Sequence, residues 1–160
     1  MKSIKELDRS DLEMSGYADE LALRNEEAQL EAGVMSSLRL WAPVVLSALA
    51  SVGQELHADR RSGHLAAWYV RLYADEESTA APPTDSVDQF TAAFAQASSP
   101  ETVELLGFVD RTVHVGAELA RLRLCRAEAA SPATRRVALS RLELAYGSAR
   151  RTATSRIVGG

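Results

Sequence analysis

The sequence predicts an all-α fold: a single compact bundle of five or six helices that closes with an antiparallel helical hairpin. Two observations support this class. Stretches rich in alanine, leucine, arginine and glutamate fill most of the chain, and no stretch alternates apolar and polar residues as a half-buried strand would. Serines that can cap a first helical turn recur, each followed by proline or by an acidic or amide residue three positions later: Ser3, Ser10, Ser86, Ser99 and Ser131.

Length and composition indicate one globular domain. A chain of 160 residues, 46% apolar and 25% charged, can bury one core and is too short for two. We expect a helical domain over residues 1–153, with a possible subdivision at the proline-containing loop 77–85, and a flexible tail over 154–160. No apolar run approaches the roughly 20 residues that span a bilayer, so no membrane partner is expected. A lone cysteine, Cys125, excludes an internal disulfide and favours a cytoplasmic setting.

The first third of the chain predicts a long helix that is interrupted at a proline. This helix is expected to begin at Ser10 and to run to Trp41, where Pro43 ends or kinks it because proline lacks the backbone donor. A second helix follows. The segment Asp59-Arg-Arg-Ser-Gly63 is interpreted as its end, with Gly63 as the left-handed cap.

The remaining chain predicts four helices. One over about 64–76 carries the most aromatic face, with Trp68 and Tyr69, and a short one from Ser86 presents Val87, Phe90, Phe94 and Ala97. A helix of about 30 residues begins at Pro100, and the last begins at Pro132. The two-residue break between these last two helices predicts the closing hairpin.

Charge is distributed unevenly along this chain. Residues 1–110 carry a net charge of −11, whereas residues 111–160 carry three acids and ten arginines, a net charge of +7. Such a region can pack against the chain's own acidic helices, bind a protein partner or a second copy, or bind phosphates of a nucleic acid. We prefer a protein partner or self-association, because aromatic residues that stack on bases are missing here apart from Tyr146. The candidate partner- or phosphate-binding residues are Arg121, Arg123, Arg126, Arg135, Arg136, Arg141, Arg150 and Arg151.

The histidines suggest a second kind of site. If one helix ran through Gly63, then His57, His64 and Trp68 would share a face, and with Tyr69 they would form a possible pocket of an enzyme or sensor. His114 lies one turn before Glu118, a spacing that two metal ligands can use. Because Gly63 is predicted to end its helix, and because a surface imidazolium is satisfied beside Asp110 and Glu118, we expect no metal and no cofactor.

The C-terminal sequence Arg156-Ile-Val-Gly-Gly160 resembles the activation junction of trypsin-like serine proteases, in which cleavage after an arginine frees an Ile-Val-Gly-Gly start. It is also similar to the double-glycine end of secreted peptide leaders. Either resemblance implies processing near Arg156 and Ile157. The alternative, which we favour, is a frayed terminus that ends in two glycines.

Motifs for nucleophilic hydrolysis, phosphate binding and zinc proteolysis are missing from the sequence. The sequence therefore predicts a non-catalytic interaction protein, an adaptor, inhibitor or assembly factor, that recognises a protein partner or itself through acidic N-terminal and arginine-rich C-terminal surfaces. A nucleic-acid-associated accessory protein is the first alternative, and a helix-lined small-ligand or metal-binding enzyme or sensor is the second.

Overall fold

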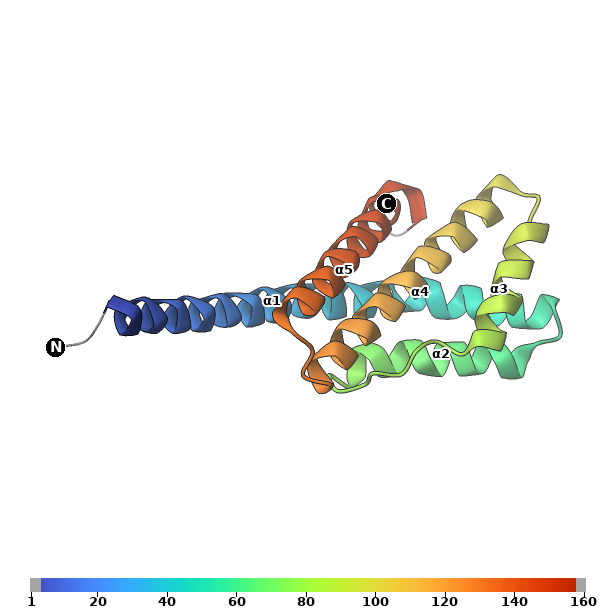
Figure 1. The fold of residues 1–160 in the computed structure, drawn as a ribbon. Coiled ribbons are helices and arrows are strands. Elements are labelled where there is room, and N and C mark those ends of the chain that lie inside the picture. The colour runs from blue at the N-terminus through green and yellow to red at the C-terminus, as the bar shows by residue number, and fades with distance from the viewer. Residues whose placement is uncertain (1–3, 158–160) are drawn as a thin grey trace.

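The computed structural model describes the backbone of residues 4–157 and the side chains of residues 16–154 and 157. Within this range the chain forms five α-helices and no strand, which confirms the all-α bundle (Figure 1). The helices are α1 (Ile4–Glu55), α2 (Asp59–Ala74), α3 (Thr84–Gln96), α4 (Pro100–Ala127) and α5 (Pro132–Thr152), and a π-helical turn, η1 (Ala153–Ile157), follows. The predicted hairpin is also confirmed, because α4 and α5 run in opposite directions from a short shared turn.

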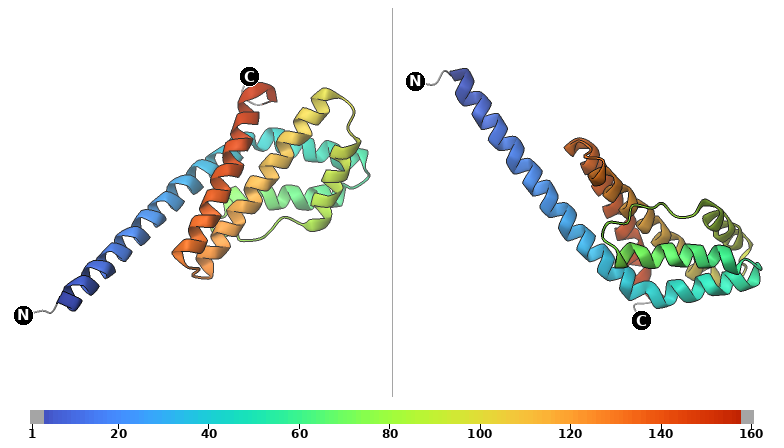
Figure 2. Two further views of the ribbon diagram at one scale, coloured as in Figure 1. Left: turned by 45° about the horizontal axis from the view of Figure 1, so that its top comes forward. Right: turned by 90° about the horizontal axis from the view of Figure 1, so that it is seen from below.

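The helix α1 is continuous where the sequence predicted an interruption. It begins before Ser10, so a start at that residue is wrong, and Ser3 lies outside the described residues. Pro43 lies inside the helix and does not end it. Trp41 and Val45 are both buried in the core, and this packing on either side of the proline holds the helix together across the missing hydrogen bond. Figure 2 shows α1 changing direction in its second half, which agrees with a proline kink.

The predicted helix end at residues 59–63 is wrong, because α2 begins at Asp59 and includes Gly63. The chain reverses before this segment, at His57, which adopts a left-handed backbone with φ 50°. Ser62 lies where α2 packs closely against α1. A Cβ added to Gly53 would lie 3.0 Å from the Ser62 Cβ, so the two helices approach through small residues.

Two of the predicted serine caps are confirmed. The side chain of Ser99 accepts a hydrogen bond from the Thr102 amide at 3.4 Å, and that of Ser131 accepts one from the Thr134 amide at 3.3 Å. Each serine precedes a proline in the first turn of its helix. Ser86 is not a cap: α3 begins at Thr84, and the buried Ser86 hydroxyl is used inside the fold.

The proline-containing loop between α2 and α3 is held against the bundle. The Trp68 Nε1 donates to the Ala80 carbonyl at 2.7 Å, and the Ser86 hydroxyl donates to the Arg61 carbonyl at 2.6 Å. Ser78 in this loop is buried. These contacts tie the loop and the start of α3 to α2.

The buried face of α1 is its most apolar part. An 18-residue stretch within Gly16–Glu55 has a mean hydropathy of 1.4, so this helix is long and apolar enough, by length and composition alone, to cross a bilayer. The test tolerates occasional charged residues, so it does not contradict the expectation that no uninterrupted apolar run of that length exists. A core helix of a soluble protein passes the same test, and Val34, Leu38 and Leu49 are buried against the other helices.

The first part of α1 extends beyond the other helices in every view (Figures 1 and 2). Tyr17 is 72% exposed and Leu21 is 48% exposed, whereas Leu23 is fully buried. We refer to residues 4–22 as the α1 arm. The opposite end of the chain is packed more closely than expected: η1 continues to Ile157, Ala153 is buried, and Ile157 packs against the core.

Candidate functional site

Three glutamates on one face of α1 meet three arginines at the α4–α5 turn. Glu20, Glu27 and Glu31 follow one another at spacings of seven and four residues, which places their carboxylates on the same side of a helix. Each carboxylate forms ion pairs with arginines of α4 or α5. We call this network the arginine–glutamate ladder: Glu20, Glu27, Glu31, Arg123, Arg126 and Arg135.

Arg123 is the most buried arginine of the ladder, with its side chain 1% exposed. Its Nε donates to the Glu31 Oε1 at 2.6 Å, and its Nη1 donates to the carbonyls of Asp75 at 3.0 Å and Ser78 at 3.2 Å. Its Nη2 lies 3.3 Å from the Met35 Sδ. The guanidinium therefore joins α4, α1 and the loop after α2, and every one of its nitrogens is engaged within the protein.

Arg135 joins α5 to two carboxylates of α1. Its Nη1 donates to the Glu20 Oε1 at 2.6 Å, and its Nε and Nη2 lie 2.9 and 2.7 Å from the Glu27 Oε1. The hydrogen bond from Arg135 lowers the pKa of the Glu20 carboxyl, and the same bond raises the pKa of Arg135. Both shifts indicate that the pair is held in its charged form.

Arg126 completes the ladder. Its Nη2 donates to both Glu31 oxygens, at 3.1 and 3.0 Å, and its Nη1 lies 3.7 Å from the Glu27 Oε2. Outside the ladder, the Arg136 Nη1 lies 3.5 Å from the Glu26 Oε2. Arg123, Arg126, Arg135 and Arg136, half of the predicted partner-binding arginines, are therefore bound to the acidic face of α1.

The other four predicted arginines are exposed. Arg121 lies 3.9 Å from Glu118 within α4, and the Arg150 guanidinium lies 5.3 Å from the centre of the Tyr146 ring. Arg141 and Arg151 form no ion pair with any described residue. These side chains, in contrast to the ladder, remain available to a ligand or partner.

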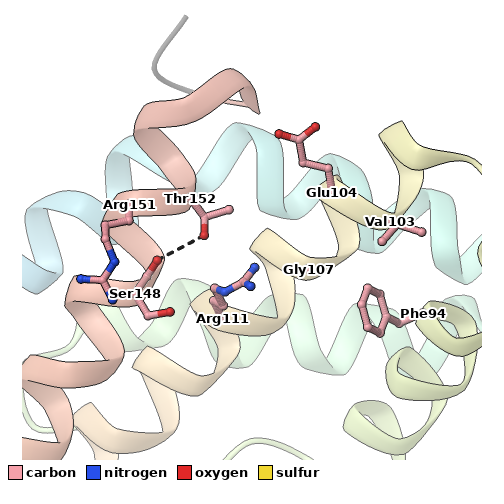
Figure 3. Close-up of a pocket in the computed structure, with 8 residues that line it drawn as sticks. All are labelled: Phe94, Val103, Glu104, Gly107, Arg111, Ser148, Arg151 and Thr152. Carbon is pink, nitrogen blue, oxygen red and sulfur yellow. Dashed lines mark hydrogen bonds between the residues drawn. The ribbon is translucent and has the colours of Figure 1, made fainter.

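Arg151 lines a hollow between α3, α4 and α5 with a volume of about 490 Å³ (Figure 3). Arg111, which likewise forms no ion pair among the described residues, lines it from α4. Figure 3 shows Arg111 between Arg151 on one side and the ring of Phe94 on the other. The Thr152 hydroxyl donates to the Ser148 carbonyl at 3.2 Å across one wall. The sequence placed both arginines in the basic region 111–160, but no pattern in it predicted that they would lie near Phe94.

The predicted histidine pocket does not form. Trp68 and Tyr69 are buried in the core, where the Tyr69 hydroxyl donates to the Leu38 carbonyl at 2.7 Å and burial raises its pKa. His57 lies in the α1–α2 turn and His64 on the surface of α2, both exposed. Within the side chains that the structure describes, no three histidine, cysteine or acidic groups are close enough to hold a metal ion.

The predicted processing site lies only partly within the described residues. Ile157 is half-buried against the core at the end of η1, while the Arg156 side chain and residues 158–160 lie outside them.

A comparison of the chain with protein-family models, curated proteins and solved structures finds no match. The function is therefore argued from the molecule's own surfaces.

Proposed function

We propose that this chain is a non-catalytic interaction protein, an adaptor, inhibitor or assembly factor, that associates with itself. In this proposal the α1 arm of one copy binds the outer face of α5 in another copy. The observation that carries the proposal is the arm itself, which extends beyond the bundle with Tyr17 and Leu21 exposed. The end of the arm is tied to the bundle by the Glu20–Arg135 ion pair, and a docking surface would stabilise the part of the helix that extends beyond the other helices.

The arm has the chemistry of a docking helix. Tyr17 and Leu21 are one turn apart and so lie on the same side. Residues 11–19 carry three acids and no base. The arm therefore offers two exposed apolar groups, Tyr17 and Leu21, at the end of an acidic stretch of sequence.

The outer face of α5 offers the opposite charge beside apolar groups. Val137 and Leu144 are both exposed and lie seven residues apart, which places them on one side of the helix. Arg141 lies between them and has no ion partner among the described residues. This face therefore suits a helix with exposed apolar groups and an acidic stretch, and the arm of a second copy has both properties.

Energetic considerations favour a contact of this kind. Burial of one large apolar side chain contributes roughly 1.5–3 kcal/mol, so the exposed leucines and tyrosine supply most of the expected affinity. Attraction between the acidic arm and the basic helix adds to the association rate, and salt screens it. We therefore expect self-association that weakens as the ionic strength rises.

Nucleic-acid binding is the second candidate, and one observation favours it. Arg121, Arg141, Arg150 and Arg151 all remain on the surface of the hairpin. The support is weaker, because four of the predicted arginines form ion pairs with α1, and two of them, Arg123 and Arg135, are buried. A direct titration with duplex DNA and with RNA at low salt separates the two candidates, since only nucleic-acid binding predicts a complex.

Sedimentation equilibrium at low and at high ionic strength tests self-association. Leu21→Ser in the arm and Leu144→Ser on α5 are expected to shift the protein toward the monomer. Leu40→Ser is the matched control, because Leu40 is 69% exposed and Leu144 is 76% exposed, yet Leu40 lies outside both proposed surfaces. A wild-type monomer under both conditions, or an equal loss of association in the control, would contradict the proposal.

A further inference from the structure

The hollow between α3, α4 and α5 differs from every other arginine cluster described above. In the ladder, each guanidinium is bound by a carboxylate of the same chain. In the hollow, Arg111 and Arg151 come from two neighbouring helices and neither has an ion partner among the described residues. Glu104 also lines the hollow, but it forms no ion pair with either arginine there, so the site carries a net positive charge.

Each of these arginines lies over a glycine of its own helix. A Cβ added to Gly107 would be 3.3 Å from the Arg111 Nη1, and a Cβ added to Gly147 would be 3.5 Å from the Arg151 Nη1. In both cases the glycine precedes the arginine by four residues, which is one helical turn. Each guanidinium therefore lies along the surface of its own helix, beside the glycine one turn before it.

The third wall of the hollow is apolar. Phe94 and Val103 are partly exposed there. Figure 3 shows the ring of Phe94 beside α4, on the other side of Gly107 from the Arg111 side chain. A ligand in the hollow would therefore meet cationic donors and an apolar surface together.

We propose that this hollow is a binding site for a small organic anion, a carboxylate or phosphate ester that carries a compact apolar group. The anionic oxygens accept hydrogen bonds from Arg111 and Arg151, as arginine forks favour. The apolar group packs against Phe94 and Val103. The volume of about 490 Å³ lies within the usual range for small-molecule sites.

Phenyl phosphate and inorganic phosphate are suitable probes, titrated into the full chain at low salt and followed by the amide chemical shifts of α4 and α5. Phenyl phosphate is expected to bind more tightly than inorganic phosphate, because only the ester has an apolar group. Arg111→Gln and Arg151→Gln are each expected to weaken phenyl phosphate binding by about tenfold or more, since each removes charge-assisted hydrogen bonds. Phe94→Ala is expected to weaken the ester and to leave inorganic phosphate unchanged.

Arg71→Gln is the matched control, because Arg71 is an exposed arginine of α2 that forms no ion pair among the described residues and does not line the hollow. It is expected to leave the affinity unchanged. Absence of binding by the wild type, equal binding of the two probes, or an equal loss in Arg71→Gln would overturn the proposal.

Discussion

Both ends of the α4–α5 hairpin carry arginines, but the arginines of one end are bound by carboxylates and those of the other end are not. At the end that contains the turn, Arg123, Arg126 and Arg135 are bound to carboxylates of α1, and Arg123 and Arg135 are also buried. At the open end, Arg111 and Arg151 are exposed and have no ion partner among the described residues. The sequence places all five in a single basic region, and the fold divides them.

This difference shows that net charge along a chain does not measure the charge available to partners. The acidic face of α1 neutralises the turn end, because Glu20, Glu27 and Glu31 reach it and their carboxylates fit the arginine forks. Among the described residues, no carboxylate of α1 pairs with Arg111 or Arg151. The arginines of the turn end are therefore used within the fold, while those of the open end have no ion partner among these residues.

The largest expected effect comes from Arg123→Ala at the turn end. The substitution leaves the carbonyls of Asp75 and Ser78 without this donor and removes the partner of Glu31 that lies 2.6 Å away. Breaking a buried ion pair from one side costs about 3–5 kcal/mol of unfolding free energy. Urea denaturation followed by circular dichroism measures this loss.

The matched variant at the open end is Arg151→Ala. Because Arg151 has no ion partner among the described residues, its unfolding free energy is expected to stay within about 0.5 kcal/mol of the wild type. Similar losses of unfolding free energy in Arg123→Ala and Arg151→Ala would mean that the arginines of the two ends contribute equally to stability.

The helix caps provide an effect of intermediate size and a check on this comparison. Ser131 caps α5 at the turn end, and Ser99 caps α4 at the open end. Ser131→Ala and Ser99→Ala are each expected to lower the unfolding free energy by about 1 kcal/mol. If the two variants lose equal amounts of unfolding free energy, the difference between the ends is due to the arginines. A several-fold larger loss in Ser131→Ala would mean that the ladder depends on the geometry of the turn.

Acid is expected to weaken the turn end by a smaller amount. The bond from Arg135 holds the pKa of Glu20 below its ordinary value of 4.5, so folding favours the ionised carboxylate. This contribution is present above that ordinary value and is lost as the pH falls through the lowered pKa. Glu20→Gln should therefore reduce the pH dependence of stability in this acidic range, as measured by urea denaturation at several pH values. An unchanged dependence would contradict the assignment.

Local signals predicted much of the fold. The pairs Ser99-Pro100 and Ser131-Pro132 mark helix starts because cap and proline act within one turn. Pro43, Ser62 and Gly63 misled the prediction, because buried side chains around Pro43 and the close approach of α1 and α2 decide the outcome there. Those contacts join segments that are separate in the sequence, so no local pattern contains them.

The site was less predictable for the same reason. The sequence allowed the arginines to pack against the chain's own acidic helices, but it did not say which arginines would reach α1. One signal was available for the hollow: a glycine precedes each of Arg111 and Arg151 by four residues. Its meaning depends on the packing of α4 beside α5, which brings both arginines to one hollow.

Exchange of arginine Nε–H protons with water, measured by nuclear magnetic resonance, tests the division of the hairpin most directly. The Nε–H groups of Arg123 and Arg135 donate to Glu31 and Glu27, so they are predicted to exchange slowly. The Nε–H groups of Arg111 and Arg151 are predicted to exchange rapidly. Exchange at Arg123 and Arg135 as fast as at Arg151 would contradict the account.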